Sequence, residues 1–244
     1  MSTLLLRFAA PIQSWGADSK FERRTTRREP TKSGVIGLAA AALGLERTAP
    51  LDELSALRFG VRIDQPGQIL RDYHTTLRPK VGELYATQQD YRKALMENGA
   101  PRVYTTERYY LCDAIFVVGL EGTSTLLEKI EQALAAPVFP LYLGRRSCPP
   151  VGRISLGIRN KPLEQALRNE VWQASKWYQR RVGSESLTIV LDSDKLGGAR
   201  QRDVPISFDY RHKRYAYRYL DDIPDAVRVS AYGTEHDAFE EVEA

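Results

Sequence analysis

Apolar residues in this chain gather in short runs, which polar, glycine-containing and proline-containing segments separate. The clearest runs are residues 3–9, 59–64 and 107–120, whose apolar positions have the spacing of buried or half-buried strands. Weaker runs predict further extended segments at residues 69–77, 137–143, 154–158, 187–191, 204–208 and 210–219.

Two segments have a helical pattern instead. Residues 35–43 are apolar on nearly every face, which predicts a buried helix with Ser33 as its N-cap and Gly44 at its end. Residues 123–136 place their apolar side chains on one face, which predicts an amphipathic helix. Shorter helices are expected to begin near residues 50–54 and 162–169.

The order of these elements predicts an α+β fold. Strand, helix and strand occur twice within the first 143 residues, which is the split pattern of a ferredoxin-like, RNA-recognition-type domain. Residues 78–107 interrupt that pattern with a polar stretch containing two prolines and two glycines. Its flanks, 69–77 and 102–112, could pair as a hairpin that projects from the body. Residues 90–97 are a candidate short helix within this insertion.

The remainder of the chain is less regular. We expect a ferredoxin-like domain over residues 1–150, a smaller and mostly β part over residues 151–232, and an acidic tail over residues 233–244.

Composition places the protein among ordinary globular chains, and charge then points to a class of partner. Of 244 residues, 43% are hydrophobic and 27% are charged, and the net charge is +4. The tail holds five acids and no lysine or arginine, so the rest of the chain carries about +9. This excess favours an anionic partner.

Two cationic segments localise the charge. Residues 20–32 hold six lysines and arginines against two glutamates, and a buried helix follows directly. The free N–H groups at the start of such a helix favour an anion. In the second segment, Arg145 and Arg146 follow an extended run and precede two prolines, a setting suited to phosphate contacts. A solvated loop for the first segment and internal ion pairs for the second remain the alternatives.

Several kinds of site have no support in the sequence. The phosphate-binding patterns GxxxxGK[ST] and GxGxxG are absent, and Cys112 and Cys148 are too far apart for a CxxC motif. The acidic stretch at residues 192–194 lacks the calcium ligands that would follow it, so it is interpreted as a turn. No metal and no cofactor is therefore expected. Without a signal peptide or a membrane-spanning apolar run, a cytoplasmic protein is expected.

Metal-independent RNA cleavage is the enzymatic alternative, because it needs only a base, an acid and a cation. Two sets of residues could supply these groups. They are Tyr73, His74 and Lys80, and Tyr210, His212 and Lys213. A structural role is the preferred interpretation of both histidines. A third alternative is a protein scaffold whose basic loops meet acidic protein surfaces.

Five ordered motifs resemble the CasD family of type I-E CRISPR Cascade subunits, within the RAMP superfamily. They are residues 4–16 (LLLRFAAPIQSWG), 30–38 (PTKSGVIGL), 70–75 (LRDYHT), 110–114 (YLCDA) and 142–149 (YLGRRSCP). The resemblance is good over residues 3–150 and weak beyond them. It is the order of the five motifs, more than any single one, that makes it specific.

The resemblance implies a non-catalytic subunit that caps the 5′ handle of the CRISPR RNA. It implies a ferredoxin-like domain whose insertion, residues 78–107, is a β-hairpin thumb packed against the backbone subunit CasC. The large subunit CasA, and target DNA near the PAM, are further implied partners. Related type I-C subunits cleave RNA through a Tyr, Lys and His set. This sequence shows no clear Lys–His pair in the thumb region.

Residue pattern and resemblance together give the candidate RNA-binding residues. Trp15 is included as a residue that could stack on a base, although a tryptophan beside a turn is more often part of a core. The candidates are Gln13, Ser14, Trp15, Arg23, Arg24, Arg27, Arg28, Thr31, Lys32, Ser33, Gly34, Arg71, Tyr73, His74, Arg108, Gly144, Arg145, Arg146 and Ser147.

Overall fold

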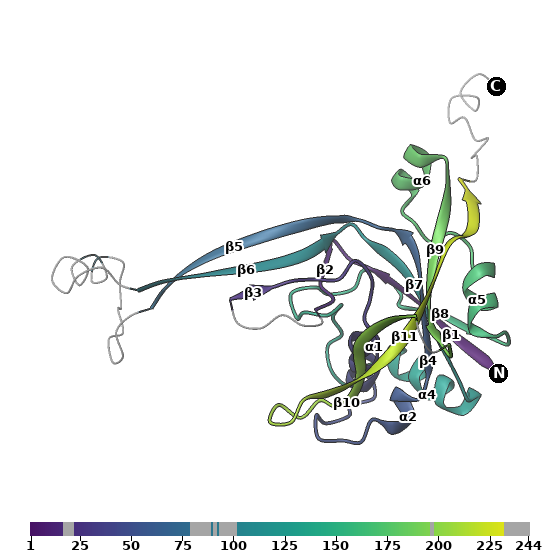
Figure 1. The fold of residues 1–244 in the computed structure, drawn as a ribbon, viewed down its shortest axis with the longest axis horizontal. Helices are drawn as coiled ribbons and strands as arrows, with labels where there is room; N and C mark the ends of the chain where they lie inside the picture. The colour runs from purple at the N-terminus through teal and green to yellow at the C-terminus, as the bar shows by residue number, and fades with distance from the viewer. Residues whose placement is uncertain (17–21, 79–88, 90–91, 93–101, 196–197, 232–244) are drawn as a thin grey trace, which may run out of the picture.

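The structure is a computed structural model. It describes residues 1–16, 22–78, 89, 92, 102–195 and 198–231. The fold is mixed α/β, with a seven-stranded antiparallel sheet, a four-stranded second sheet and short helices (Figure 1). Apart from residues 89 and 92, which are helical, residues 79–101 of the insertion lie outside the described residues, as does the acidic tail; of the candidate helix at 90–97, only residue 92 is described.

The large sheet has the strand order β10-β11-β9-β4-β7-β1-β8. Its strands, in chain order, are β1 (Ser2–Ala9), β4 (Arg58–Gln65), β7 (Ile115–Gly122), β8 (Ser155–Arg159), β9 (Ser184–Ser193), β10 (Ala199–Ser207) and β11 (Arg214–Ser230). The helices whose bounds the structure describes are α1 (Lys32–Ala42), α2 (Asp52–Ser55), α4 (Ser124–Ala135), α5 (Leu163–Asn169) and α6 (Lys176–Val182).

Both faces of the central strands are covered, which explains why three consecutive residues of β1, Leu4 to Leu6, are apolar. Leu4 and Leu6 belong to a core that also contains apolar residues of α1 and α4. Leu5 points to the opposite face and belongs to a second core with α5. Because successive side chains of a strand alternate between faces, a strand buried on both sides cannot alternate apolar with polar residues.

The apolar run at 107–120 is two strands rather than the single long strand predicted. The smaller sheet consists of β2 (Ile12–Gln13), β3 (Arg23–Arg24), β5 (Gln68–Arg78) and β6 (Arg102–Cys112). Strand β6 ends at Cys112, and β7 begins at Ile115 in the other sheet. Asp113 makes the turn with a φ of 54°, a left-handed conformation that aspartate tolerates better than most residues.

The prediction of an extended segment at 137–143 as the next strand of the sheet is also wrong. That segment forms no strand, and its backbone donates hydrogen bonds to the last turn of α1 instead. The strand that pairs with β1 on this side is β8, at residues 155–159.

The hairpin predicted from the flanks of the 78–107 insertion is confirmed. Gln68 to Arg78 pair antiparallel with Cys112 to Arg102 without a register shift. Figure 1 shows this long two-stranded ribbon projecting from the body, to the left of the view.

The large sheet crosses the domain boundary expected at residue 150. Strand β9 pairs with β4, and β8 pairs with β1, so strands from both expected parts share one sheet. None of the helices in the described ranges is both long and apolar enough to span a membrane.

Candidate nucleic-acid interface

The start of α1 differs from the expected anion site. Thr31, not Ser33, is the N-cap, and its hydroxyl oxygen accepts a hydrogen bond from the Gly34 N–H at 3.3 Å. The Lys32 N–H donates to the Asp203 carboxylate at 2.9 Å. The prediction of free N–H groups is therefore wrong for these two positions, because a carboxylate of the same chain already caps the helix.

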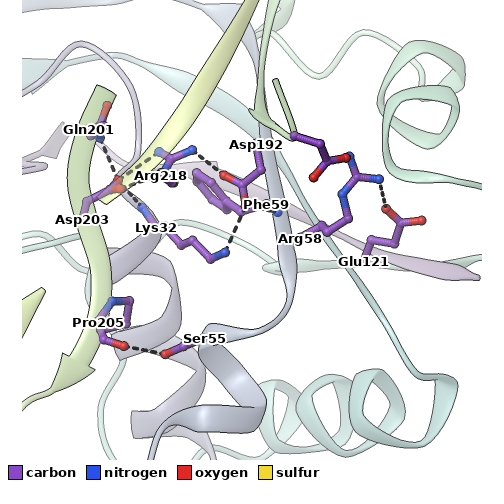
Figure 2. A network of polar contacts seen from close by, with 11 residues as sticks. Lys32, Ser55, Arg58, Phe59, Glu121, Asp192, Gln201, Asp203, Pro205 and Arg218 are labelled. Carbon is purple, nitrogen blue, oxygen red and sulfur yellow. Dashed lines mark hydrogen bonds and ion pairs between the residues drawn. The ribbon is translucent and has the colours of Figure 1, made fainter. Parts of the chain in front are cut away.

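Lys32 itself is buried in a network of charged side chains (Figure 2). Its ammonium group lies 2.9 Å from the Asp192 carboxylate. Arg218 bridges Asp192 at 2.7 Å and Asp203 at 2.6 Å, and its guanidinium lies over the Phe59 ring. Burial lowers the pKa of Arg218, but the two carboxylates outweigh it and raise that pKa overall. This charge is used inside the protein, so Lys32 does not present a cation to RNA.

Three further candidates, Gln13, Ser14 and Trp15, are buried rather than available to a ligand. The Gln13 amide donates to the Ala114 carbonyl at 2.6 Å and accepts from the Trp15 indole N–H at 3.2 Å. The Trp15 ring stacks on Phe8 with centroids 5.6 Å apart. Stacking of Trp15 on a base is thus excluded in this conformation, and the core interpretation is correct.

Two of the remaining cations lie over adjacent tyrosines of β6, which point to opposite faces of that strand. The Arg23 guanidinium lies 5.4 Å from the centre of the Tyr109 ring. Arg145, from the loop after residue 143, lies 4.7 Å from the centre of the Tyr110 ring. Its Nη2 donates to the Arg24 carbonyl at 3.0 Å, which joins the two cationic segments predicted from the sequence.

Gly144 explains why the second cationic segment can approach so closely. Its φ is +85°, and a Cβ at this position would lie 1.7 Å from the Ser14 carbonyl oxygen. Only glycine combines that backbone conformation with that contact. Arg145 is therefore positioned by a turn that a side chain at residue 144 would disturb.

Two guanidinium N–H groups at this junction are buried and have no acceptor among the described residues. They belong to Arg145 Nη1 and Arg27 Nε. The Arg27 backbone N–H donates to the Trp15 carbonyl at 2.8 Å, so that arginine is anchored beside the first motif. A buried charged donor without a partner is costly, and an anionic oxygen would satisfy it.

The base of the projecting hairpin adds Arg71, which forms an ion pair with Glu107. The hydrogen bond from Arg71 lowers the pKa of Glu107. On β5, His74 hydrogen-bonds to the Asp72 carboxylate, and Tyr73 is exposed.

The other residues considered are at least partly exposed, except for two lysines that lie outside the described residues. Arg108 is half-buried and pairs in register with Arg24. Lys20 and Lys80 lie outside the described residues. The exposed RNA-binding candidates include Arg28, Arg146 and Ser147. The second set considered for RNA cleavage is also exposed, at the turn between β10 and β11; it consists of Tyr210, His212 and Lys213.

Sequence reasoning missed the buried network of Lys32, Asp192, Asp203 and Arg218. Lys32 was predicted to bind RNA instead, and the acidic stretch at 192–194 was interpreted as a turn, whereas Asp192 lies within β9. Among the described residues, no group of three or more His, Cys, Asp or Glu side chains is arranged to hold a metal ion.

Comparison with known proteins gives a consistent result. The model of the family described as "CRISPR-associated protein (Cas_Cas5)" matches residues 3–221. The "CRISPR system Cascade subunit CasD" of Escherichia coli (strain K12) is 38% identical over 170 residues, which are 64% of this chain and 70% of that protein.

Two solved structures are similar over nearly the whole chain. One, described as "Crystal structure of Cas protein", has a TM-score of 0.68 at 35% identity and covers 91% of this chain and 94% of its own. The other, described as "CRISPR RNA-guided surveillance complex", has a TM-score of 0.73 at 32% identity and covers 98% of this chain and 97% of its own.

Proposed function

The chain belongs to the CRISPR-associated Cas5 family, and from this membership we propose that it is the CRISPR-RNA-binding CasD subunit of a Cascade surveillance complex. The relative from Escherichia coli is a Cascade subunit, and one structural neighbour is part of an RNA-guided complex. Both likenesses extend over most of the chain, so the proposal concerns the whole fold rather than one motif.

The RNA site lies, in our proposal, where the two cationic segments meet over β6. The carrying observation is the pair of buried, unpartnered guanidinium N–H groups of Arg27 and Arg145. Arg23 lies over Tyr109 on the opposite face of β6 and pairs with Glu107 at 3.7 Å, so it is not part of this site. Arginines that hold phosphates beside aromatic rings suit the splayed single strand that a 5′ handle presents.

The test is a double variant, Arg27→Gln with Arg145→Gln, assayed for binding of a labelled repeat-derived RNA over a series of salt concentrations. Each charge-assisted hydrogen bond contributes about 1.5–3 kcal/mol, so affinity should fall at least tenfold. Two lost phosphate contacts should also reduce the slope of log K against log salt by about 1.4.

The matched control is Arg180→Gln with Arg181→Gln on α6, which removes the same charge from exposed positions. It should bind the RNA like the wild-type chain. Equal affinity of the Arg27 and Arg145 variant and the wild type would contradict the proposed site.

We also propose which parts of this chain correspond to two features of the Cas5 family, the ferredoxin-like unit and the thumb. Strands β4, β7, β1 and β8, with α1 and α4, make up its ferredoxin-like unit, which the antiparallel order of these strands supports. The projecting β5–β6 hairpin is the thumb that contacts the backbone subunit CasC, with CasA seated beside the subunit. A ribbon that leaves the body of a subunit needs a partner to cover it, which supports this role.

We propose further that the subunit is non-catalytic. Tyr73 and His74 are adjacent on β5, so they point to opposite faces of the ribbon and do not converge on one phosphate. Incubating the protein with labelled repeat RNA in EDTA should leave the RNA intact. A single specific cut that His74→Ala abolishes would establish the endoribonuclease alternative.

A further inference from the structure

The β10–β11 hairpin carries a second group of cations and tyrosines that the proposed RNA site does not use. Arg200 and Arg202 lie two residues apart on β10, opposite Tyr219 and Tyr217 of β11. The Arg200 guanidinium is 4.3 Å from the centre of the Tyr217 ring and 5.8 Å from that of Tyr219. Residues of this spacing share one face of a strand, so the four side chains form a continuous patch.

The turn of this hairpin adds further cations. Arg211, Lys213 and Arg214 are exposed there, beside Tyr210, which is 69% exposed. The one acid of the turn, Asp209, accepts a hydrogen bond from the Arg211 backbone N–H at 2.9 Å. We call the patch and the turn together the hairpin surface; it comprises Arg200, Arg202, Tyr210, Arg211, Lys213, Arg214, Tyr217 and Tyr219.

The cations of the hairpin differ in whether they have a carboxylate partner, and Arg214, which shares the strand face of Arg218, has none among the described residues. Arg218 is buried and bridges two carboxylates. On the hairpin surface, no carboxylate of the described residues forms an ion pair with any of the five cations. The acid of the turn is the only one within residues 204–219. The charges of the hairpin surface are therefore available to a ligand, whereas the charge of Arg218 stabilises the fold.

We propose that the hairpin surface is a second binding site, for the backbone and bases of a single-stranded nucleic acid. Regularly spaced guanidinium groups match successive phosphates, and exposed tyrosine rings offer platforms on which bases of any sequence stack. Tyr217 is 56% exposed although Arg200 lies over it. An acidic protein surface would need the cations but not the exposed rings, so the rings favour nucleic acid.

The position of the hairpin surface in the fold supports a site separate from the proposed RNA site. Figure 1 shows the β10–β11 turn and the β5–β6 ribbon leaving the body toward the same side, with β2 and β3 between them. The hairpin surface therefore lies on the side of the molecule that carries the proposed RNA site, but on different strands. A strand bound there would be held in addition to the CRISPR RNA.

The test uses the full chain and two labelled probes, a 20-nucleotide oligothymidylate and a 20-nucleotide oligouridylate, followed by fluorescence anisotropy. The test variant combines Arg211→Gln, Lys213→Gln and Arg214→Gln. It should weaken binding at least tenfold and reduce the salt slope by about 2, since three contacts to single-stranded phosphates are lost. Comparing the two probes shows whether the site prefers DNA or RNA.

A matched triple variant on α6 is the control: Lys176→Gln, Arg180→Gln and Arg181→Gln. These residues are exposed, and Figure 1 draws α6 far from the β10–β11 turn. The control should bind both probes like the wild type. Equal losses in the two triple variants would overturn the proposal, because they would indicate an effect of net charge alone.

The stacking step has its own test. Tyr217→Ala should weaken binding about tenfold, whereas Tyr217→Phe, which keeps the ring, should not. Unchanged melting temperatures exclude a folding defect. If the hairpin variants bind both probes like the wild type but lose a protein subunit of the complex, the surface is a protein-docking site and the proposal is wrong.

The proposed RNA site and the hairpin surface can be tested independently of each other. The Arg211, Lys213 and Arg214 variant should keep its affinity for repeat-derived RNA, and the Arg27 and Arg145 variant should keep its affinity for oligothymidylate. A loss of both activities in either variant would contradict the separation of the sites.

Discussion

Folding changes the pKa of one residue of the first cationic segment, Glu29. Burial raises the pKa of Glu29, which lies in the fields of Arg27 and Arg218 and of Asp203 and Asp222. The folded chain therefore keeps this proton at pH values where the unfolded chain, with an ordinary pKa of 4.5, has lost it. Stability falls as pH rises through that window, because the folded state then binds more protons.

Glu29→Gln should consequently stabilise the protein at pH 7 and have little effect below about pH 4.5. Urea unfolding at a series of pH values measures the difference. Glu22→Gln, at an exposed position of the same segment, is the matched control and should not reproduce the pattern. A gain for Glu29→Gln that stays the same at every pH would contradict the role of its ionisation.

Gly144 gives a second prediction at this scale. Gly144→Ala forces a left-handed residue and a contact with the Ser14 carbonyl, so it should destabilise the protein and weaken binding of repeat-derived RNA. Gly152 has a similar φ of +76° but no atom within 4 Å of an added Cβ. Gly152→Ala should therefore cost only about 1–2 kcal/mol of stability and leave RNA binding unchanged. Thermal melts and RNA titrations of both variants separate backbone strain from displacement of Arg145.

At the scale of elements, the buried charged network holds β9, β10 and β11 against α1. Asp203→Asn keeps an oxygen for the Lys32 N–H but leaves Arg218 with one carboxylate. Breaking a buried pair in this way should cost about 3 kcal/mol. Combining it with Arg218→Met removes the stranded charge, so the double variant should be less unstable than the sum of the two single variants. Purely additive losses in denaturant unfolding would show that the two residues are not coupled.

The sequence predicted the elements whose signals are local. Strand β1 and helix α4 follow from apolar spacing, and the paired flanks of the projecting hairpin follow from the polar insertion between two extended segments. The turn at Asp113 was missed because neither glycine nor proline marks it, and apolar residues continue on both sides. The fourth strand beside β1 was misplaced because residues 137–143 have the stronger apolar pattern, although their two prolines disfavour a strand inside a sheet, whereas 155–159 have only two apolar residues, Leu156 and Ile158.

The candidate site was predictable in part for the same reason. The two cationic segments were visible in the sequence, but the contacts that their side chains make inside the protein were not. Asp203 and Arg218 are 15 residues apart and Lys32 and Asp192 are 160 apart, so no spacing rule connects them. The N-cap at Thr31 and the burial of Trp15 likewise depend on contacts made by distant parts of the chain.

At the scale of the whole molecule, the large sheet joins the two halves of the chain. Arg62 of β4 is fully buried, pairs with Asp64 at 2.7 Å and donates to the carbonyls of Leu167, Glu170 and Val171. Burial raises the pKa of Asp64, although the hydrogen bonds and charge of Arg62 lower it. Without residues 163–171, this guanidinium would lose three of its acceptors.

A fragment of residues 1–150 should therefore not fold on its own. It would expose one edge of β1 and one edge of β4, which β8 and β9 cover in the full chain. It would also uncover Leu5 and Val117, which pack with apolar residues of α5. Open edges and exposed apolar strands favour aggregation over a stable sheet. Circular dichroism melts should show no cooperative transition for the fragment, and co-expression of residues 151–244 should restore one. A cooperative transition for residues 1–150 alone would instead support a domain boundary at residue 150.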